Sequence, residues 1–259
     1  MVDIVIVTAL WKRPNLTRLM LEHTRRVAQQ TSLEVELVAV GSEGDQTRAM
    51  CDKASWKYVE HPNEALNHKW NQGVLKAQEF DPASVLILGS DDFIDQALLE
   101  DYNALIKNEG GNHGLNDNYA LDLRRFMVGH WPGYRLNQYR IKDWLWAYKL
   151  MGRPCGPARI FDRPSLMKLG WKLWNDDPPI QRCLDGNNHR RLKAHGLTLK
   201  GHYQNEMRGS LIAVKNGQSI PQVGGLQRSW VNNPLVFLER HFSKRELNQL
   251  LTMHWGLAS

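Results

Sequence analysis

Apolar residues in the first hundred positions follow two different periods. Strands are predicted at 3–10, 34–40, 56–60 and 85–88, and helices at 15–30 and 65–80. The run 85–88, Val-Leu-Ile-Leu, is apolar without a break, as in strands that are buried on both faces of a parallel sheet. Strands that alternate with helices in this way predict an α/β fold, in which helices flank a mostly parallel sheet.

The second half of the chain has a less regular pattern. A short helix is predicted at 163–170, a longer one at 179–195 and a strand at 197–200. Glycine and asparagine are dense between 205 and 233, which favours a loop or lid. A closing helix follows, and Ser243-Lys244-Arg245-Glu246 has the spacing of a capping box at its start.

Composition indicates a globular protein and bears on the cellular compartment in which it works. The chain has 259 residues, of which 42% are hydrophobic and 23% are charged, so we expect a real hydrophobic core. No run approaches the roughly 18 apolar residues that span a bilayer, and the first residues do not resemble a signal peptide. Three scattered cysteines form no metal or disulfide pattern. We therefore expect a cytoplasmic protein, in the host cytoplasm if it is viral.

Polar residues follow several predicted strands, at 8–13, 41–45 and 90–92. Ligands of open α/β sheets bind outside the carboxyl ends of the strands. Asp91 and Asp92 are adjacent carboxylates after a buried strand, where they repel each other and are costly to desolvate. A divalent cation would neutralise them, and oxygen ligands favour Mg²⁺ or Mn²⁺. The alternative is a structural turn with an aspartate as helix cap.

Five segments occur in a characteristic order. They are Lys12-Arg13-Pro14, Asn67–Gly73, Leu86–Asp92, Arg163–Gly170, and Leu184-Asp185 with Arg191–Gly196. Together they resemble the GT-A glycosyltransferases, in particular the inverting family-two-like group. Two positions depart from that group: Gly89 replaces the first acid of its Asp-x-Asp motif, and Leu184 replaces a glutamate.

The resemblance implies a GT-A, Rossmann-like single domain with a C-terminal helical extension. Residues 1–205 would form this domain, with a nucleotide-sugar half at 1–110 and an acceptor half at 111–205. Residues 206–259 would form the loop or lid and the closing helix. The implied donor is a nucleotide-diphosphate sugar, with UDP as the commonest carrier, and the implied cofactor is Mn²⁺ or Mg²⁺.

The resemblance also suggests roles for single residues. Asp185 is the candidate general base, because an in-line displacement needs a carboxylate to take the proton of the acceptor hydroxyl. Asp176 and Asp177 are rivals for this role. The candidate metal ligands are Asp91, Asp92 and His202. The candidate donor-binding residues are Thr8, Arg13, Glu43, Lys69, Asn71 and Ser90.

The segment Arg124–Arg153 carries seven Lys or Arg residues, one acid and seven aromatic residues. Cations that contact phosphates and rings that stack on bases are typical of nucleic-acid binding. A small enzyme with such a face resembles phage enzymes that glycosylate hydroxymethylated pyrimidines in DNA. The same composition also fits long cationic side chains that cover a tryptophan-rich core.

Other functions remain open. The acceptor could be a glycan, a lipid-linked sugar or a small metabolite. A nucleotidyltransferase is disfavoured because Thr8–Pro14 contains no glycine for a phosphate loop. A non-catalytic nucleic-acid-binding module is a further alternative, but it would not explain the predicted α/β domain.

Overall fold

The computed structural model describes residues 2–134, 152–181, 184–216 and 230–258. The strands are β1 (Ile4–Ala9), β2 (Val35–Gly41), β3 (Lys57–Glu60), β4 (Ser84–Ile87), β5 (Asp92–Ile94), β6 (Asn112–Leu115), β7 (Asn118–Asp122), β8 (Met127–Trp131), β9 (Arg159–Asp162), β10 (Leu199–His202) and β11 (Leu211–Lys215). The helices are α1 (Pro14–Gln30), α2 (Asp45–Lys53), α3 (Leu66–Gln78), α4 (Gln96–Glu109), α6 (Arg163–Lys168), α7 (Leu184–Ala194), α8 (Pro234–Glu239) and α9 (Lys244–Ala258).

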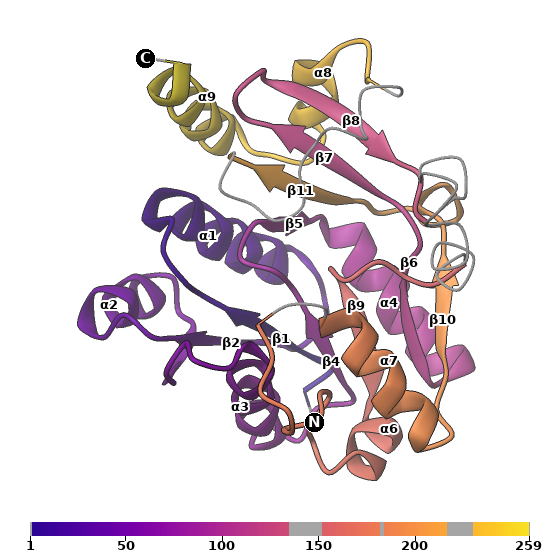
Figure 1. Cartoon of the computed structure of the whole chain (residues 1–259). Coiled ribbons are helices and arrows are strands. Elements are labelled where there is room, and N and C mark those ends of the chain that lie inside the picture. The colour runs from indigo at the N-terminus through magenta and orange to yellow at the C-terminus, as the bar shows by residue number, and fades with distance from the viewer. Residues whose placement is uncertain (1, 135–151, 182–183, 217–229, 259) are drawn as a thin grey trace, which may run out of the picture.

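A seven-stranded sheet lies at the centre of the molecule, in the order β10-β6-β9-β4-β1-β2-β3 (Figure 1). β1 pairs in parallel with β2 and β4, β2 pairs in parallel with β3, and β10 pairs in parallel with β6. Only β9 runs in the opposite direction, between β4 and β6. The predicted α/β fold with a mostly parallel sheet is confirmed.

Helices cover both faces of this main sheet because its strands are apolar on both sides. In β1, Ile4 and Ile6 belong to one hydrophobic cluster, and Val5 and Val7 belong to the other. The first cluster includes side chains of α1, α2 and α4, whereas the second includes side chains of α3, α6 and α7. Successive residues of a strand point to opposite faces, so β1 is buried from both sides.

A second sheet has the order β5-β11-β7-β8 and packs with α8 and α9 beside the main sheet (Figure 1). β11 runs antiparallel to β5 and parallel to β7. The sequence pattern placed 205–233 in a loop or lid, but 211–215 is a buried strand of this sheet. The proposed boundary at 205 therefore separates β11 from its partner strands, and the rest of the predicted lid, at 217–229, lies outside the described residues.

The predicted capping box opens α9. The Ser243 amide donates to Glu246 Oε2 at 2.6 Å, and the Glu246 amide donates to Ser243 Oγ at 3.3 Å. Glu246 also pairs with Arg26 on α1 at 2.9 Å. Although burial raises the pKa of Glu246, hydrogen bonds from His23 and Arg26 bring it down to about 2. This network fixes α9 against α1.

Among the residues described, no helix is both long and apolar enough to cross a bilayer.

Helix α3 approaches the sheet so closely that one position accepts only glycine. A Cβ atom on Gly73 would lie 2.5 Å from Val7 Cγ1 and 2.8 Å from Val40 Cγ2. We expect Gly73→Ala to lower the free energy of unfolding by about 1–3 kcal/mol, because overpacking outweighs the better helix propensity of alanine. Urea unfolding measures this change.

The matched control is Gly256→Ala in α9, where a Cβ atom meets nothing within 4 Å. This variant should be neutral, or more stable by up to about 1 kcal/mol. Equal effects of the two substitutions would contradict the close packing of α3.

Candidate functional site

The strand directions bring several polar segments to one edge of the main sheet. β1, β2, β4, β6 and β10 run in parallel, so their carboxyl ends lie at the same edge. β9 runs the other way, and Arg159 at its start lies opposite Ile87 at the end of β4. The candidate site is therefore built from segments that leave these carboxyl ends and from the loop that enters β9.

Arg13 reaches from the start of α1 to the end of β4. Its Nη2 atom donates to Ser90 Oγ at 2.8 Å, and its Nη1 atom donates to Asp91 Oδ2 at 3.1 Å. Lys12 and Arg13 both have left-handed backbones, with φ of 56° and 55°. Such conformations are unfavourable for residues other than glycine and cluster at functional sites. The turn between β1 and α1 thus holds Arg13 over Ser90 and Asp91.

Lys215, the last residue of β11, contacts the same carboxylate. Its Nζ atom lies 3.0 Å from Asp91 Oδ2, and the Val214 amide donates to the Asp91 carbonyl at 2.7 Å. Sequence reasoning missed Lys215 because it lay in the presumed lid. The apolar run Leu211–Val214 is the signal that would have indicated a strand there.

The two adjacent aspartates have opposite electrostatic surroundings. Burial acts to raise the pKa of Asp91, but Lys215 and Arg13 hold it below its ordinary value. Burial, followed by the charge of Asp91, raises the pKa of Asp92 to about 7. Asp91 is thus the charged partner of the two cations, whereas burial and the charge of Asp91 make Asp92 easier to protonate.

The donor atoms of this turn do not fit the oxygen shell that Mg²⁺ or Mn²⁺ requires. Asp91 Oδ2 is taken by two cations, and Asp92 Oδ2 accepts the Gly89 amide at 3.0 Å. A Cβ atom on Gly89 would lie 2.3 Å from Asp92 Oδ2, so the Asp92 carboxylate fills the place of a side chain at 89. Within the described part of the chain, no three His, Cys, Asp or Glu side chains are grouped to hold a metal.

His202, the third predicted metal ligand, ends β10 at the same edge of the sheet but beyond β9 and β6. Its Nε2 atom lies 3.0 Å from His113 Nδ1, within hydrogen-bonding distance. The structure therefore brings Asp91 and Asp92 together and does not join His202 to them.

Asp185, the predicted general base, lies in the first turn of α7. Its side chain is 47% exposed, and its Oδ1 atom lies 3.5 Å from Arg159 Nη2. A Cβ atom on Gly156 would lie 2.7 Å and 2.8 Å from the two carboxylate oxygens, so the chain at 156 passes directly beside them. Buried Arg159 fixes this loop, because it donates to the carbonyls of Cys155 and Pro154 at 2.9 Å each.

Cys155 connects the two halves of the site. Burial raises the pKa of its thiol, Arg159 opposes this change, and Asp185, Asp92 and Asp117 add to it. Arg159, which lies opposite Ile87 at the end of β4, also lies 3.5 Å from Asp185. Asp185 and the turn that carries Asp92 therefore share one region at the edge of the sheet.

Two predicted donor-binding residues, Lys69 and Asn71, are buried supports of this edge. Lys69 is 0% exposed and uses its three donor protons on Leu10 O, Ser42 Oγ and Asn63 Oδ1, at 2.6, 3.1 and 3.0 Å. Asn71 is buried and bonds to the backbone of Trp174. Contact of Lys69 or Asn71 with a donor stays a prediction, and it would require the side chain to give up these bonds.

Thr8 and Glu43, the remaining predicted donor-binding residues, differ in access. Thr8 is fully buried near the end of β1, and its Oγ1 atom has no hydrogen-bond partner among the described residues, so its role in a nucleoside pocket stays a prediction. Glu43 is exposed beyond the end of β2, where its Oε2 atom accepts the Lys12 amide at 2.9 Å. Glu43 is therefore accessible to a ligand, the Arg13 side chain is 17% exposed, and Ser90 is buried beneath Arg13, from which its hydroxyl accepts a hydrogen bond.

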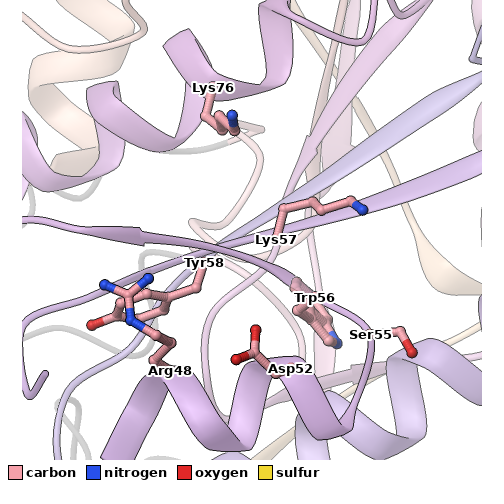
Figure 2. A pocket seen from close by; sticks show the side chains of 7 residues that line it. All are labelled: Arg48, Asp52, Ser55, Trp56, Lys57, Tyr58 and Lys76. Atoms are coloured by element: carbon pink, nitrogen blue, oxygen red, sulfur yellow. The ribbon is translucent and has the colours of Figure 1, made fainter. Parts of the chain in front are cut away.

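A separate groove is lined by side chains of α2, of β3 and the turn before it, and of α3 (Figure 2). Its lining residues are Arg48, Asp52, Ser55, Trp56, Lys57, Tyr58 and Lys76. Lys57 begins β3, so the groove flanks the amino ends of the parallel strands, away from Asp91 and Asp185. Glu60 pairs with Arg48 at 3.4 Å and Glu79 pairs with Lys76 at 2.6 Å, which leaves little net charge there. We do not assign the function to this groove.

Comparison with solved structures identifies the fold. The mannosyltransferase PcManGT from Pyrobaculum calidifontis, in complex with GDP-Man and Mn²⁺, matches 99% of this chain and 76% of its own, with a TM-score of 0.52 and 12% identity. TarS residues 1–349 from S. aureus match 98% of this chain and 71% of their own, with a TM-score of 0.47 and 14% identity. The same TarS fragment in complex with UDP gives a TM-score of 0.46.

No family model matches the chain, and no curated protein matches it by sequence. The similarity to the mannosyltransferase shows that this chain has the GT-A glycosyltransferase fold. At 12% identity it shows the fold alone.

The ammonium of Lys69 gives the site a specific pH dependence. Burial lowers the pKa of Lys69 from 10.5 to about 8, and nearby Glu43 opposes this shift. The unfolded chain keeps this proton to higher pH than the folded chain, so Lys69 makes the free energy of unfolding rise between pH about 8 and about 10.5. Lys69→Met removes this rise. The stability difference, wild type minus variant, should therefore grow across this range in urea unfolding.

Lys76→Met on the same helix is the control, because that side chain is partly exposed and its ion pair lies at the surface. Its stability difference from wild type should stay constant over the same pH range. A constant difference for Lys69→Met would show that Lys69 titrates normally.

Proposed function

We propose that the chain is a glycosyltransferase, which moves a sugar from a nucleoside-diphosphate sugar to an acceptor hydroxyl. One observation carries the proposal: the carboxyl edge of a GT-A-fold sheet brings together a cation cluster and a half-exposed carboxylate. The cluster joins Arg13 and Lys215 at Asp91, and the carboxylate is Asp185. The cations suit a diphosphate, and the carboxylate suits proton removal from a hydroxyl.

Asp185 acts as general base in the proposed reaction. The acceptor oxygen attacks the anomeric carbon while its proton passes to a carboxylate oxygen of Asp185. The bond between the anomeric carbon and the diphosphate oxygen breaks, and the diphosphate leaves with the electron pair. A single in-line displacement inverts the configuration at that carbon. Arg159 positions Asp185, because it holds the loop at 154–156 and lies 3.5 Å from the carboxylate.

UDP is the first donor carrier to test, since the sequence resemblance favours it. Solved structures of the same fold contain UDP in TarS and GDP-Man in PcManGT. Both nucleotides therefore belong in the donor panel. Glu43, at the end of β2, is the accessible candidate for contact with the nucleoside.

Hydroxymethylated pyrimidine DNA is the acceptor that the sequence favours. This prediction rests on the segment Arg124–Arg153, of which residues 135–151 lie outside the described part of the chain. In its described part, Trp131 and Tyr134 pack edge to face, with ring centroids 5.2 Å apart. An acceptor panel should therefore compare hydroxymethylated DNA, unmodified DNA and oligosaccharides. Transfer only to oligosaccharides would remove DNA from the proposal.

The test of the reaction is Asp185→Asn. This change keeps the shape of the side chain and removes the base, so the release of nucleoside diphosphate from the bound donor should fall by about 10²–10⁴-fold. Binding of the nucleoside diphosphate, followed by thermal shift, should stay unchanged because the proposed diphosphate site is at Arg13 and Lys215. Water or any acceptor that proves active can receive the sugar.

Asp176→Asn is the matched control. The Asp176 side chain is also 47% exposed, but it pairs with Lys172 and Asn71 instead of lying beside Gly156. Its variant should keep near-normal turnover. Near-normal turnover in Asp185→Asn would refute the base assignment, and a loss confined to Asp176→Asn would transfer the role to that residue.

A further inference from the structure

The carboxylate of Asp91 lies between two side-chain cations. Arg13 Nη1 and Lys215 Nζ lie 3.1 and 3.0 Å from the same oxygen, Asp91 Oδ2. The three side chains are only 17, 14 and 15% exposed, for Arg13, Lys215 and Asp91 respectively. Ion pairs with little solvent access are screened less than surface pairs. The negative charge of Asp91, a predicted metal ligand, is thus already matched by two cationic side chains of the protein.

The neighbouring acid is not directed at a ligand either. The Asp92 carboxylate accepts the Gly89 amide at 3.0 Å, and its residue is 4% exposed. Because a Cβ atom on Gly89 would lie 2.3 Å from Asp92 Oδ2, this inward position depends on the missing side chain at 89. The same glycine removes the first acid of the family motif. The glycine at 89 thus leaves the turn without a first acid and gives the Asp92 carboxylate room to point inward.

A departing nucleoside diphosphate needs compensating positive charge in the transition state. Arg13 can present two donors to phosphate oxygens, and Lys215 can present a compact charge. Arg13 is fixed by the left-handed turn after β1, and Lys215 is fixed by the end of β11. Both cations are thus positioned by rigid elements before a ligand arrives.

We propose that Arg13 and Lys215 take the place of a divalent metal ion in this protein, and that they bind the donor diphosphate by exchanging the Asp91 carboxylate for phosphate oxygens. The inference rests on the proposed function, because it assumes a nucleoside-diphosphate donor. It makes Lys215, which no sequence motif marked, a ligand of the leaving group.

Calorimetric titration of the full chain with UDP and with GDP tests the proposal, in EDTA and in Mn²⁺ or Mg²⁺. The nucleotide that binds should do so with affinities that agree within about threefold in chelator and in metal. Lys215→Met should weaken binding by about 10-fold or more, as expected for a lost charge-assisted bond. Lys215→Arg should restore most of the affinity, which separates loss of charge from loss of folding.

Lys200→Met is the matched control, because Lys200 is also a strand lysine paired with a carboxylate, Glu109 at 3.2 Å. It should leave nucleotide binding unchanged. Asp91→Asn gives the sharpest contrast. If the cations act directly, this variant keeps or improves binding, because it frees two cations and removes a negative charge. If a metal mediates binding, the same variant loses it.

The outcomes separate this inference from the proposed function. Binding in EDTA that depends on Lys215 and survives Asp91→Asn supports both. Binding that requires Mn²⁺ or Mg²⁺ and disappears in Asp91→Asn overturns the inference and leaves the glycosyltransferase in place. Failure of folded protein to bind any nucleotide, in EDTA or in metal, overturns both.

Discussion

Asp91 joins the two sheets of the molecule through both its backbone and its side chain. Its carbonyl accepts the amide of Val214 in the second sheet, while its carboxylate binds Lys215 from that sheet and Arg13 from the turn after β1. A buried carboxylate without partners would be very costly. The contacts of Asp91 therefore help to hold β11 over the carboxyl edge of the main sheet, together with the backbone pairing of β11 with β5 and β7.

Polar residues near the strand ends fall into two groups with different tasks. One group consists of Lys69, Asn71 and Arg159, which are buried and donate hydrogen bonds to backbone carbonyls and neighbouring side chains. They hold the loops at fixed distances, as buried hydrogen-bonded groups generally do. Asp185 keeps an exposed carboxylate. The few accessible groups are thus held in place by a larger number of buried polar residues.

Periodicity predicted the first half of the fold well, because β1, α1, β2, α3 and β4 form by local pattern and are buried in the expected way. The second sheet escaped prediction for a physical reason. β11 has only five residues, lies among glycine and asparagine, and is stabilised by pairing with β5 and β7, which are distant in sequence. Non-local pairing of this kind leaves no periodic signal in a short segment.

The same limit applies to the residues predicted for the site. Arg13, Ser90, Asp91 and Asp185 follow strands or begin helices, where topology alone places them at the carboxyl edge. Lys69 and Asn71 were assigned from a motif within a helix, but α3 turns both side chains toward the protein interior. Motif spacing states which residues are present, whereas the direction of a side chain depends on how its helix packs.

The cluster at Asp91 also shows how one set of charges can serve both folding and binding. A diphosphate that takes Arg13 and Lys215 from Asp91 breaks two side-chain ion pairs and leaves the backbone bond from Val214 intact. The pairing of β11 with β5 and β7 also remains. Ligand exchange therefore need not separate the sheets, because the backbone fixes the geometry and the side chains supply charge that can be transferred. Two cations that are already desolvated and held in place lose little further freedom on binding, which is the physical basis of a preorganised anion site.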